Sequence, residues 1–210
     1  MIAMLFLAKI ESIHYTTGEQ HMLRFKKYLI SLALFGSING YALELGGTLA
    51  DINIPTKGEL ILNKSKVDYK AWSTSTISRG TPALIFHLAA RMSSDKIIDP
   101  LRTRLEQENF TPGSFQSISV VNIDDAMWGT AGLVGSEMEK NKRAHPEAIM
   151  VADDASRGLK AWELQKGTVA VILLDASGEI RYLKEGKLHS SDIDTILSLL
   201  KTEIALVASK

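Results

Sequence analysis

The feature that most constrains this chain is an apolar run that stops at a polar junction. Residues 83–90 read ALIFHLAA and are apolar except for His87. A continuous apolar run of this length is typical of a strand covered on both faces of its sheet. Arg91 and two serines follow, and a helical pattern of apolar residues then continues from Ile97 to about Asn109. The sequence therefore predicts a buried strand that feeds a helix across a tight loop.

Local signals refine the predicted helix. Ser93 or Ser94 is expected to cap it, with Asp95 in its first turn. Pro100 interrupts the pattern, and we expect it to kink or divide the helix, because proline lacks the backbone N–H that a helix interior needs.

The rest of the chain alternates between strand and helix patterns. Further strands are predicted at residues 58–62, 115–123, 148–153, 168–174 and 179–183. Helices are predicted at 136–143 and from Ser190 or Ser191 onward, with a short helix or turn at 154–164. Extended or irregular chain is expected at 43–57, 63–78 and 129–135, the last forming a loop with Trp128. This order predicts an α/β fold with a mixed central sheet flanked by helices and a C-terminal hairpin plus helix.

The N-terminal region has the pattern of a secretory signal peptide. Arg24, Lys26 and Lys27 precede a short apolar run at residues 29–38, and Gly40-Tyr41-Ala42 is a small-x-small cleavage site. The run is well short of the ~20 residues that a membrane span needs. We expect cleavage after Ala42 and no membrane span in the processed protein.

Residues 1–21 precede this signal peptide and are interpreted as a mis-assigned leader, with Met22 as the initiator. Residues 1–42 are set aside, which leaves residues 43–210 as one domain. The excluded part holds four of the 24 basic and two of the 24 acidic side chains, so residues 43–210 carry a slight negative charge. This balance gives no support to nucleic-acid binding.

The chain contains no cysteine. This excludes disulfides, thiol catalysis and thiolate metal sites. The sequence also lacks the G-x-S-x-G, H-E-x-x-H, Walker-type and dinucleotide-binding glycine motifs. We therefore assign no catalytic residues, no metal ligands and no cofactor.

The segment FHLAARMSS resembles the F-W-A-S-W-C-x-x-C segment of thioredoxin-like proteins. Read without a gap, Arg91 and Ser94 occupy the positions of the two redox cysteines. The later run TVAVILLDASG resembles the hairpin of the same superfamily, with Gly167 in place of the usual proline beside the redox site. The resemblance implies a thioredoxin-like fold without its redox chemistry.

Four motifs in the same order resemble the YtfJ family of small secreted Gram-negative proteins. They are RGTPALIFHLAARMSSDK, SVVNIDDAMWGTAG, RGLKAW followed by leucine, and VILLDASG. The family has no established activity, and some members have been labelled transcriptional regulators, a label that a signal peptide and an acidic balance disfavour. Together with the signal peptide, the resemblance implies a periplasmic protein.

The predicted strand-to-helix junction carries the main site hypothesis. Arg91, Ser93 and Ser94 would lie at a helix N-terminus, where free N–H groups, hydroxyls and a guanidinium favour a phosphate, sulfate or carboxylate. Asp95 counts against this, because its carboxylate would satisfy the same donors. In the alternative, a serine merely caps the helix and Arg91 pairs with a neighbouring acid such as Asp124.

Two other candidates have plainer alternatives. His87 is either an acid/base group or a histidine at the edge of the core. Asp124 and Asp125 follow a predicted strand and either bind a cation or form a turn and helix entry. Adjacent carboxylates are a weak signal for a metal site, because neighbouring side chains on a strand point apart. Ser93, Asp95 and His87 include the residue types of a hydrolytic triad, but closeness in sequence is no evidence of triad geometry.

These observations favour a periplasmic binding or chaperone-like module that acts on an envelope protein or a small anionic ligand. The first alternative is a non-thiol enzyme that uses a pocket at the strand-to-helix junction. The second is a cytoplasmic regulator. The sequence does not address the oligomeric state.

Overall fold

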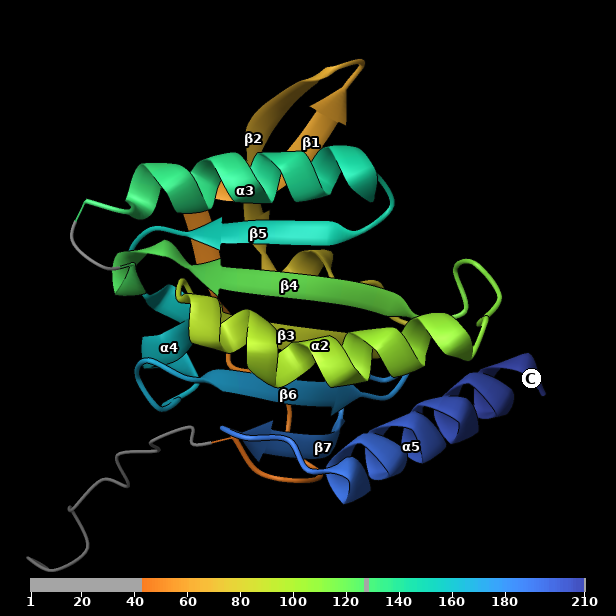
Figure 1. The fold of residues 1–210 in the computed structure, drawn as a ribbon. Coiled ribbons are helices and arrows are strands. Elements are labelled where there is room, and N and C mark those ends of the chain that lie inside the picture. Colours follow the sequence, from red (N-terminus) through yellow and green to blue (C-terminus); the bar gives the residue numbers. More distant parts are fainter. Residues whose placement is uncertain (1–42, 127–128, 210) are drawn as a thin grey trace, which may run out of the picture. The chain divides into compact units, whose positions relative to one another are not determined.

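The computed structural model describes residues 43–126 and 129–209, which contain a seven-stranded sheet in the order β2-β1-β5-β4-β3-β6-β7 (Figure 1). Its strands are β1 (Asn53–Asn63), β2 (Lys66–Ser73), β3 (Ala83–Ala89), β4 (Gln116–Asn122), β5 (Ile149–Asp153), β6 (Val169–Leu174) and β7 (Ile180–Glu185). Its α-helices are α2 (Met92–Gln107), α3 (Ala131–Ala144), α4 (Arg157–Ala161) and α5 (Ser190–Ala208). Two 3₁₀ turns complete it, η1 (Thr74–Thr76) and η2 (Ile123–Asp125).

The sheet is mixed, as the sequence predicts. β3, β4 and β5 run parallel to one another, whereas β6 is antiparallel to β3 and forms a hairpin with β7. The carboxyl ends of the three parallel strands therefore meet at one end of the sheet, where β6 begins. Helices α2, α3 and α5 all cover the same face (Figure 1).

Two hydrophobic cores lie on opposite faces of the sheet, because successive β3 side chains point to opposite sides. Leu84 and Phe86 belong to the core that contains side chains of α2 and α5. Ile85 belongs to the other core, which includes Trp72 and Trp162. Trp162 also donates its indole N–H to the Ala50 carbonyl at 3.0 Å, so the segment before β1 is fastened over this second face.

The β1–β2 hairpin is the largest departure from the sequence prediction. β1 begins at Asn53 rather than at residue 58, and β2 lies in the segment that was expected to be irregular. β1 contains a register irregularity and joins β5 through only two residue pairs, Gly58 with Ala152 and Glu59 with Val151. The outer part of the hairpin instead packs side chains against α3.

Two helix predictions are wrong in detail. α2 is a single helix that continues through Pro100 and ends at Gln107, so the proline does not divide it. α3 begins at Ala131, and the segment expected to form a loop therefore contributes its first turns. Gly132 and Gly135 lie on α3 where a Cβ would meet open space, which shows why glycines on this face do not prevent the helix.

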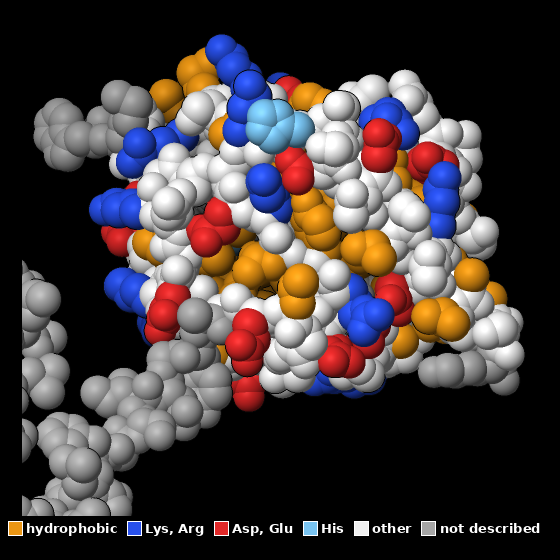
Figure 2. Space-filling view, turned by 90° about the horizontal axis from the view of Figure 1, so that it is seen from below, with side chains coloured by type: hydrophobic (Ala, Val, Ile, Leu, Met, Phe, Trp, Pro, Cys, Tyr) orange, Lys and Arg blue, Asp and Glu red, His pale blue; other side chains and the backbone are white. Residues whose placement is uncertain are grey.

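The first described residues run along the outer edge of β7. The Gly46 N–H donates to the Ile180 carbonyl at 2.9 Å, and the Ile180 N–H donates to the Gly47 carbonyl at 2.8 Å. Figure 2 looks onto this side of the molecule and shows hydrophobic side chains in the middle of the face with charged ones around them. The start of β7 is thus paired on both sides, although β7 is the last strand of the sheet.

The predicted signal peptide and Trp128 lie outside the described residues. Between residues 43 and 126 and between 129 and 209, every helix is too short or too polar to cross a membrane.

Candidate functional site

Buried polar side chains gather at the carboxyl ends of β3, β4 and β5. Among the described residues nine polar or charged side chains are buried, and five of these lie at this end of the sheet. They are His87, Asn122, Asp125, Asp153 and Ser156. Ligand sites of open α/β sheets form outside the carboxyl ends of their strands. The concentration of polar groups that are costly to bury therefore marks this end as the candidate site.

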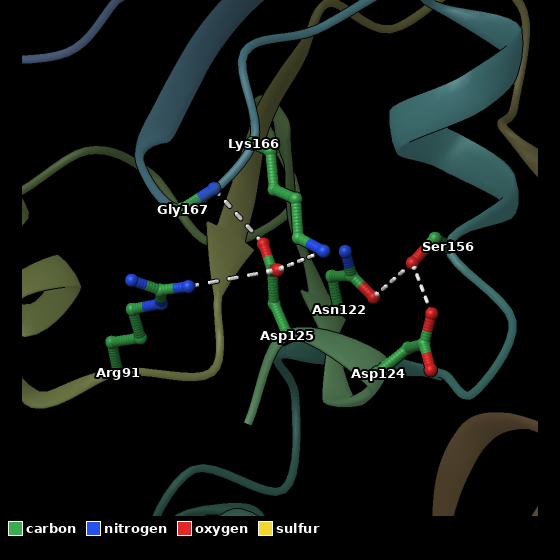
Figure 3. Close-up of polar contacts among 7 residues, drawn as sticks. All are labelled: Arg91, Asn122, Asp124, Asp125, Ser156, Lys166 and Gly167. Carbon is green, nitrogen blue, oxygen red and sulfur yellow. Dashed lines mark hydrogen bonds and ion pairs between the residues drawn. The ribbon is translucent and has the colours of Figure 1, made fainter. Parts of the chain in front are cut away.

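Asp125 is the centre of the charged contacts (Figure 3). Its side chain is only 2% exposed, and its Oδ2 accepts a hydrogen bond from the Gly167 N–H at 3.0 Å. Arg91 Nη2 and Lys166 Nζ each lie 3.8 Å from its Oδ1. Both distances exceed hydrogen-bond length, and Oδ1 accepts no hydrogen bond from the described residues. One buried carboxylate thus faces two cations and neutralises only one of them.

The Arg91 guanidinium lies directly on the loop that precedes β6. A Cβ added to Gly167 would be 3.2 Å from Arg91 Cζ and within 3.4 Å of both terminal nitrogens. Gly167 also has φ +77°, a conformation that glycine adopts far more readily than other residues. Glycine at this position therefore lets the arginine and the loop pack closely.

A second polar network lies beside Asp125. The Ser156 hydroxyl is 3.0 Å from Asn122 Oδ1 and 2.8 Å from Asp124 Oδ2 (Figure 3). Because a serine hydroxyl has one proton, it donates to only one of these two oxygens at a time. Ser156 has φ +52°, a left-handed backbone conformation, at the point where its hydroxyl bridges η2 and β4.

Asp153 fixes the segment that follows β5. Its Oδ1 accepts from the Ala155 N–H at 3.2 Å, and its Oδ2 accepts from the Gly158 N–H at 2.9 Å. Asp153 is also the register partner of Asn122 on the neighbouring strand. The two side chains are therefore brought together by the parallel pairing of β4 and β5.

His87 lies on the same face of the sheet as Asn122 and Asp153, but farther from the end of its strand. It is 2% exposed, its ring centroid is 6.0 Å from that of Trp162 at an interplanar angle of 75°, and Gly158 packs beside both rings. Burial lowers the pKa of His87 to about 4, although the negative charges of Asp153 and Asp125 oppose this shift. Its Nε2 has no hydrogen-bond partner among the described residues. His87 is thus a neutral core histidine at pH 7.

The serines predicted to cap α2 do not do so. The helix starts at Met92, Arg91 occupies the N-cap position, and no side chain makes a capping hydrogen bond there. Ser93 is exposed, whereas Ser94 is buried and its Oγ has no hydrogen-bond partner among the described residues. The capping prediction is wrong because the helix begins one residue before the first of the two serines.

Asp95 does not fill the α2 N-terminus. Its carboxylate pairs instead with Arg102 at 3.4 Å on the helix surface. The predicted pairing of Arg91 with a neighbouring acid is right in kind but wrong in partner, because Arg91 pairs with Asp125 while Asp124 bonds to Ser156. The structure therefore brings Arg91 to the candidate site and leaves its guanidinium side partly exposed.

Sequence reasoning missed the parts of the site that come from other strands. Asn122, Ser156 and Lys166 were not singled out as candidates, and Asp153 gave only a weak signal for a cation site. The available signal was the position of Asn122 and Asp153 near the ends of predicted strands, whereas Ser156 and Lys166 lie in connecting segments. Among the described residues no group of three or more His, Asp or Glu side chains is arranged to hold a metal ion.

Comparison with known sequences identifies the family. The profile of the family described as "Bacterial protein of unknown function (YtfJ_HI0045)" matches residues 43–203. The chain belongs to this family. It is 30% identical over 179 residues to an uncharacterised Haemophilus influenzae protein, covering 83% of this chain and 97% of that one. It is 28% identical to the uncharacterised protein YtfJ of Escherichia coli, covering 78% of this chain and 88% of that one.

Solved structures confirm the thioredoxin-like fold of this YtfJ family member. A protein described as thiol:disulfide interchange protein DsbE from Chlorobium tepidum matches with a TM-score of 0.53 and 14% identity, covering 78% of this chain and 99% of that one. The thioredoxin domain of a thiol-disulfide oxidoreductase from Bacteroides vulgatus matches with a TM-score of 0.50 and 19% identity, covering 76% and 99%. At these identities the likeness concerns the fold alone. The absence of cysteine is consistent with a lack of thiol redox activity.

Proposed function

We propose that this protein is a periplasmic binding module without thiol redox activity, and that it binds an acidic group at the sheet end where Arg91 and Lys166 flank Asp125. The observation that carries the proposal is that two exposed cations flank a buried carboxylate whose Oδ1 accepts a hydrogen bond from neither of them. The Arg91 side chain is 43% exposed and the Lys166 side chain 74% exposed, against 2% for Asp125. An incoming anion would meet both cations without displacing the carboxylate.

The neighbouring helix terminus supports the same ligand chemistry. α2 begins next to Arg91 without a side-chain cap, and Asp95 points its carboxylate to Arg102 instead. The first N–H groups of a helix carry partial positive charge, and a guanidinium binds carboxylate or phosphate through two parallel hydrogen bonds. A carboxylate or phosphate group is therefore the expected ligand, with the exposed Ser93 hydroxyl as a further donor.

Exposed apolar side chains at the same end favour a protein as the bearer of this anion. Met92 is 84% exposed and Leu133 72% exposed. They stand in the first turns of α2 and α3, and both helices begin at the end of the sheet where β4 and β5 terminate (Figure 1). Methionine and arginine are enriched at protein interfaces. We therefore favour an envelope protein with an acidic segment, bound in a chaperone-like or scaffolding role.

The non-thiol enzyme is the less favoured reading of the same site. His87 would be its acid/base group, but the imidazole is 2% exposed and neutral at pH 7. Asp153 and Ser156 are likewise buried and engaged in hydrogen bonds that hold the fold. These groups support the surface rather than react at it.

The proposed location rests on the signal peptide. The protein isolated from its native host is expected to begin at Leu43, and N-terminal sequencing checks this. A protein that still begins at Met1 or Met22 would contradict export and cleavage.

Binding is tested by site-specific photo-crosslinking in periplasmic extract. A photoreactive residue at Met92 is expected to capture an envelope protein, whereas the same residue at Leu206, which is 52% exposed on α5, is the control and is expected not to capture it. The captured protein is then purified and its affinity measured directly. Arg91→Ala and Lys166→Ala should each weaken binding at least tenfold, and Arg104→Ala in the last turn of α2 should leave it unchanged. Equal capture from both positions would count against a specific surface.

The anion component is tested separately with inorganic phosphate. Backbone amide resonances of residues 91–96 and of Gly167 are expected to shift saturably at millimolar phosphate. The shifts should disappear in Arg91→Ala. Absence of a saturable shift in the parent protein would remove the anion site from the proposal.

A further inference from the structure

A cavity of about 190 Å³ lies at the opposite end of the sheet from the candidate site. It is bounded by the chain before β1, the segment after η1 and the turn that follows β6. Its walls include Leu174 at the end of β6 and Thr81 just before β3. The volume is below the ~300 Å³ at which pockets for drug-sized ligands begin, so the cavity suits a molecule of only a few heavy atoms.

Charges of both signs line this cavity without pairing. Asp51, Arg79 and Asp175 are all lining residues. None of the three takes part in an ion pair within 4.0 Å in the part of the chain that the structure describes, although twelve such pairs occur elsewhere in it. Because the charges that line this space do not pair with one another, each is available to pair with an opposite charge on a ligand.

Arg79 is held at the cavity by the β6–β7 turn. It donates from Nη1 to the Ser177 carbonyl, and its guanidinium lies where a Cβ on Gly178 would otherwise be. Gly178 also has φ +89°, which glycine adopts readily, so glycine at this position allows both the turn and the close approach of Arg79. A guanidinium has five N–H donors, and those that Ser177 does not use remain for a ligand carboxylate.

Asp51 lines the cavity from the segment before β1. Its Oδ1 accepts a hydrogen bond from the Thr74 hydroxyl at 3.1 Å, and the same hydroxyl accepts from the Ile52 N–H at 3.1 Å. Asp175 adds a second negative charge, and its Oδ1 is fully used by the turn, accepting from the N–H groups of Ser177 and Glu179. Asp51 comes from a different segment of the cavity lining than the β6–β7 turn that holds Arg79 and contains Asp175, and we assign it as the partner of an ammonium group.

We propose that this cavity binds a small zwitterion, namely a free α-amino acid with a short apolar side chain. Its carboxylate pairs with Arg79 and its ammonium group pairs with Asp51, which uses two of the three unpaired charges. Leu49, Ile77 and Leu174 supply the apolar lining for the side chain. The site is separate from the sheet end of Arg91, so it is independent of the function proposed above.

The test uses L-alanine as the probe and the full processed protein. L-Alanine is expected to shift the backbone amide resonances of residues 48–51, 77–81 and 175–178 saturably, with a dissociation constant in the millimolar range. Propionate lacks the ammonium group and ethylammonium lacks the carboxylate, so each is expected to bind at least tenfold more weakly. Resonances of residues 91–96 should not respond, which separates this site from the anion site.

Variants complete the test. Arg79→Gln and Asp51→Asn should each weaken L-alanine binding at least tenfold, whereas Arg181→Gln on β7 should not. Arg79→Lys keeps the charge without the planar fork and should give an intermediate affinity. Equal binding of L-alanine and propionate, or unchanged binding in folded Arg79→Gln, would overturn the zwitterion site. Absence of any saturable shift with L-alanine would overturn it as well.

Discussion

The Arg91 guanidinium packs against the backbone of Gly167, so that a Cβ at residue 167 would stand 3.2 Å from Arg91 Cζ. The two residues lie 76 positions apart, at the start of α2 and just before β6. Asp125 contacts both, since it pairs with Arg91 and accepts the Gly167 N–H. The three residues form one unit, which makes the contribution of each measurable against the others.

Gly167→Ala is expected to destabilise the fold more than the same substitution at a second glycine that has a similar φ angle. Gly113 is the matched control, because it has φ +79° but no atom within 4 Å of a built Cβ, whereas Gly167 has φ +77° and Arg91 in contact. A left-handed alanine costs about 1–2 kcal/mol at either position. Chemical denaturation should show a further loss at 167 only, and this excess should vanish in an Arg91→Ala background. Equal losses at both positions would contradict the contact.

Asp125→Ala is expected to lower the free energy of unfolding by about 1–3 kcal/mol, because it leaves the Gly167 N–H without its acceptor and Arg91 without its ion-pair partner. Asp99→Ala removes an exposed partner of Arg102 and should change stability by no more than about 0.5 kcal/mol. Urea titrations of both variants measure the difference. Similar effects for the buried and the exposed aspartate would argue against the network.

His87 makes the fold sensitive to acid. Its pKa is about 4 in the folded protein against 6.5 for an ordinary histidine, so the unfolded chain takes up the proton first as the pH falls. The contribution of His87 to the free energy of unfolding is complete above pH 6.5 and is lost between pH 6.5 and about 4. It amounts to about 3 kcal/mol. Denaturation at a series of pH values should give a shallower acid loss for His87→Gln than for the parent. His145→Gln, at an exposed histidine, should keep the parental slope.

Lys142 is expected to stabilise the connection from α3 to β5. Its ammonium group is buried and donates to the carbonyls of Pro146 at 2.8 Å and Ala148 at 2.6 Å. Burial lowers its pKa, with Glu59 and Glu147 opposing the shift. Lys142→Met should cost about 1–3 kcal/mol, since both carbonyls lose a donor. Thermal unfolding of Lys140→Met, at an exposed pair, supplies the control and should be close to parental.

The parent protein is expected to show no disulfide reductase activity. Thiolate attack requires cysteine, and the chain has none. An insulin-reduction assay of protein freed from contaminating thiol proteins should give only the background rate. Turnover above that background would contradict the prediction.

The sequence predicted β3 and β6 because continuous apolar runs identify strands covered on both faces, and it predicted β4 from a run that alternates and then becomes apolar. It did not predict β2, because only Val67 and Trp72 are buried on this edge strand and its other residues resemble a polar loop. The start of α3 was hidden by Gly132 and Gly135, which have low helix propensity but face open space. Tertiary contacts with the β1–β2 hairpin compensate for that propensity.

Of the candidate site, the sequence predicted the place of Arg91 but not its partner. Asp124 and Asp125 are adjacent, and the 3₁₀ turn η2 determines which carboxylate turns inward. Asn122 and Asp153 lie together because of the β4–β5 register, and no local pattern encodes that register. Lys166 reaches Asp125 from a loop far along the chain, a contact that only the folded topology creates.

The narrow junction between β1 and β5 divides the sheet into two parts that need not open together. Gly58 with Ala152 and Glu59 with Val151 are the two backbone register pairs that join the hairpin to the five remaining strands. Backbone amides of the outer hairpin should therefore exchange with solvent through partial openings that leave β3, β4 and β6 protected. The hairpin and α3 would then behave as one low-stability cooperative unit, while the strands that carry Arg91 and Asp125 to their places exchange only on global unfolding.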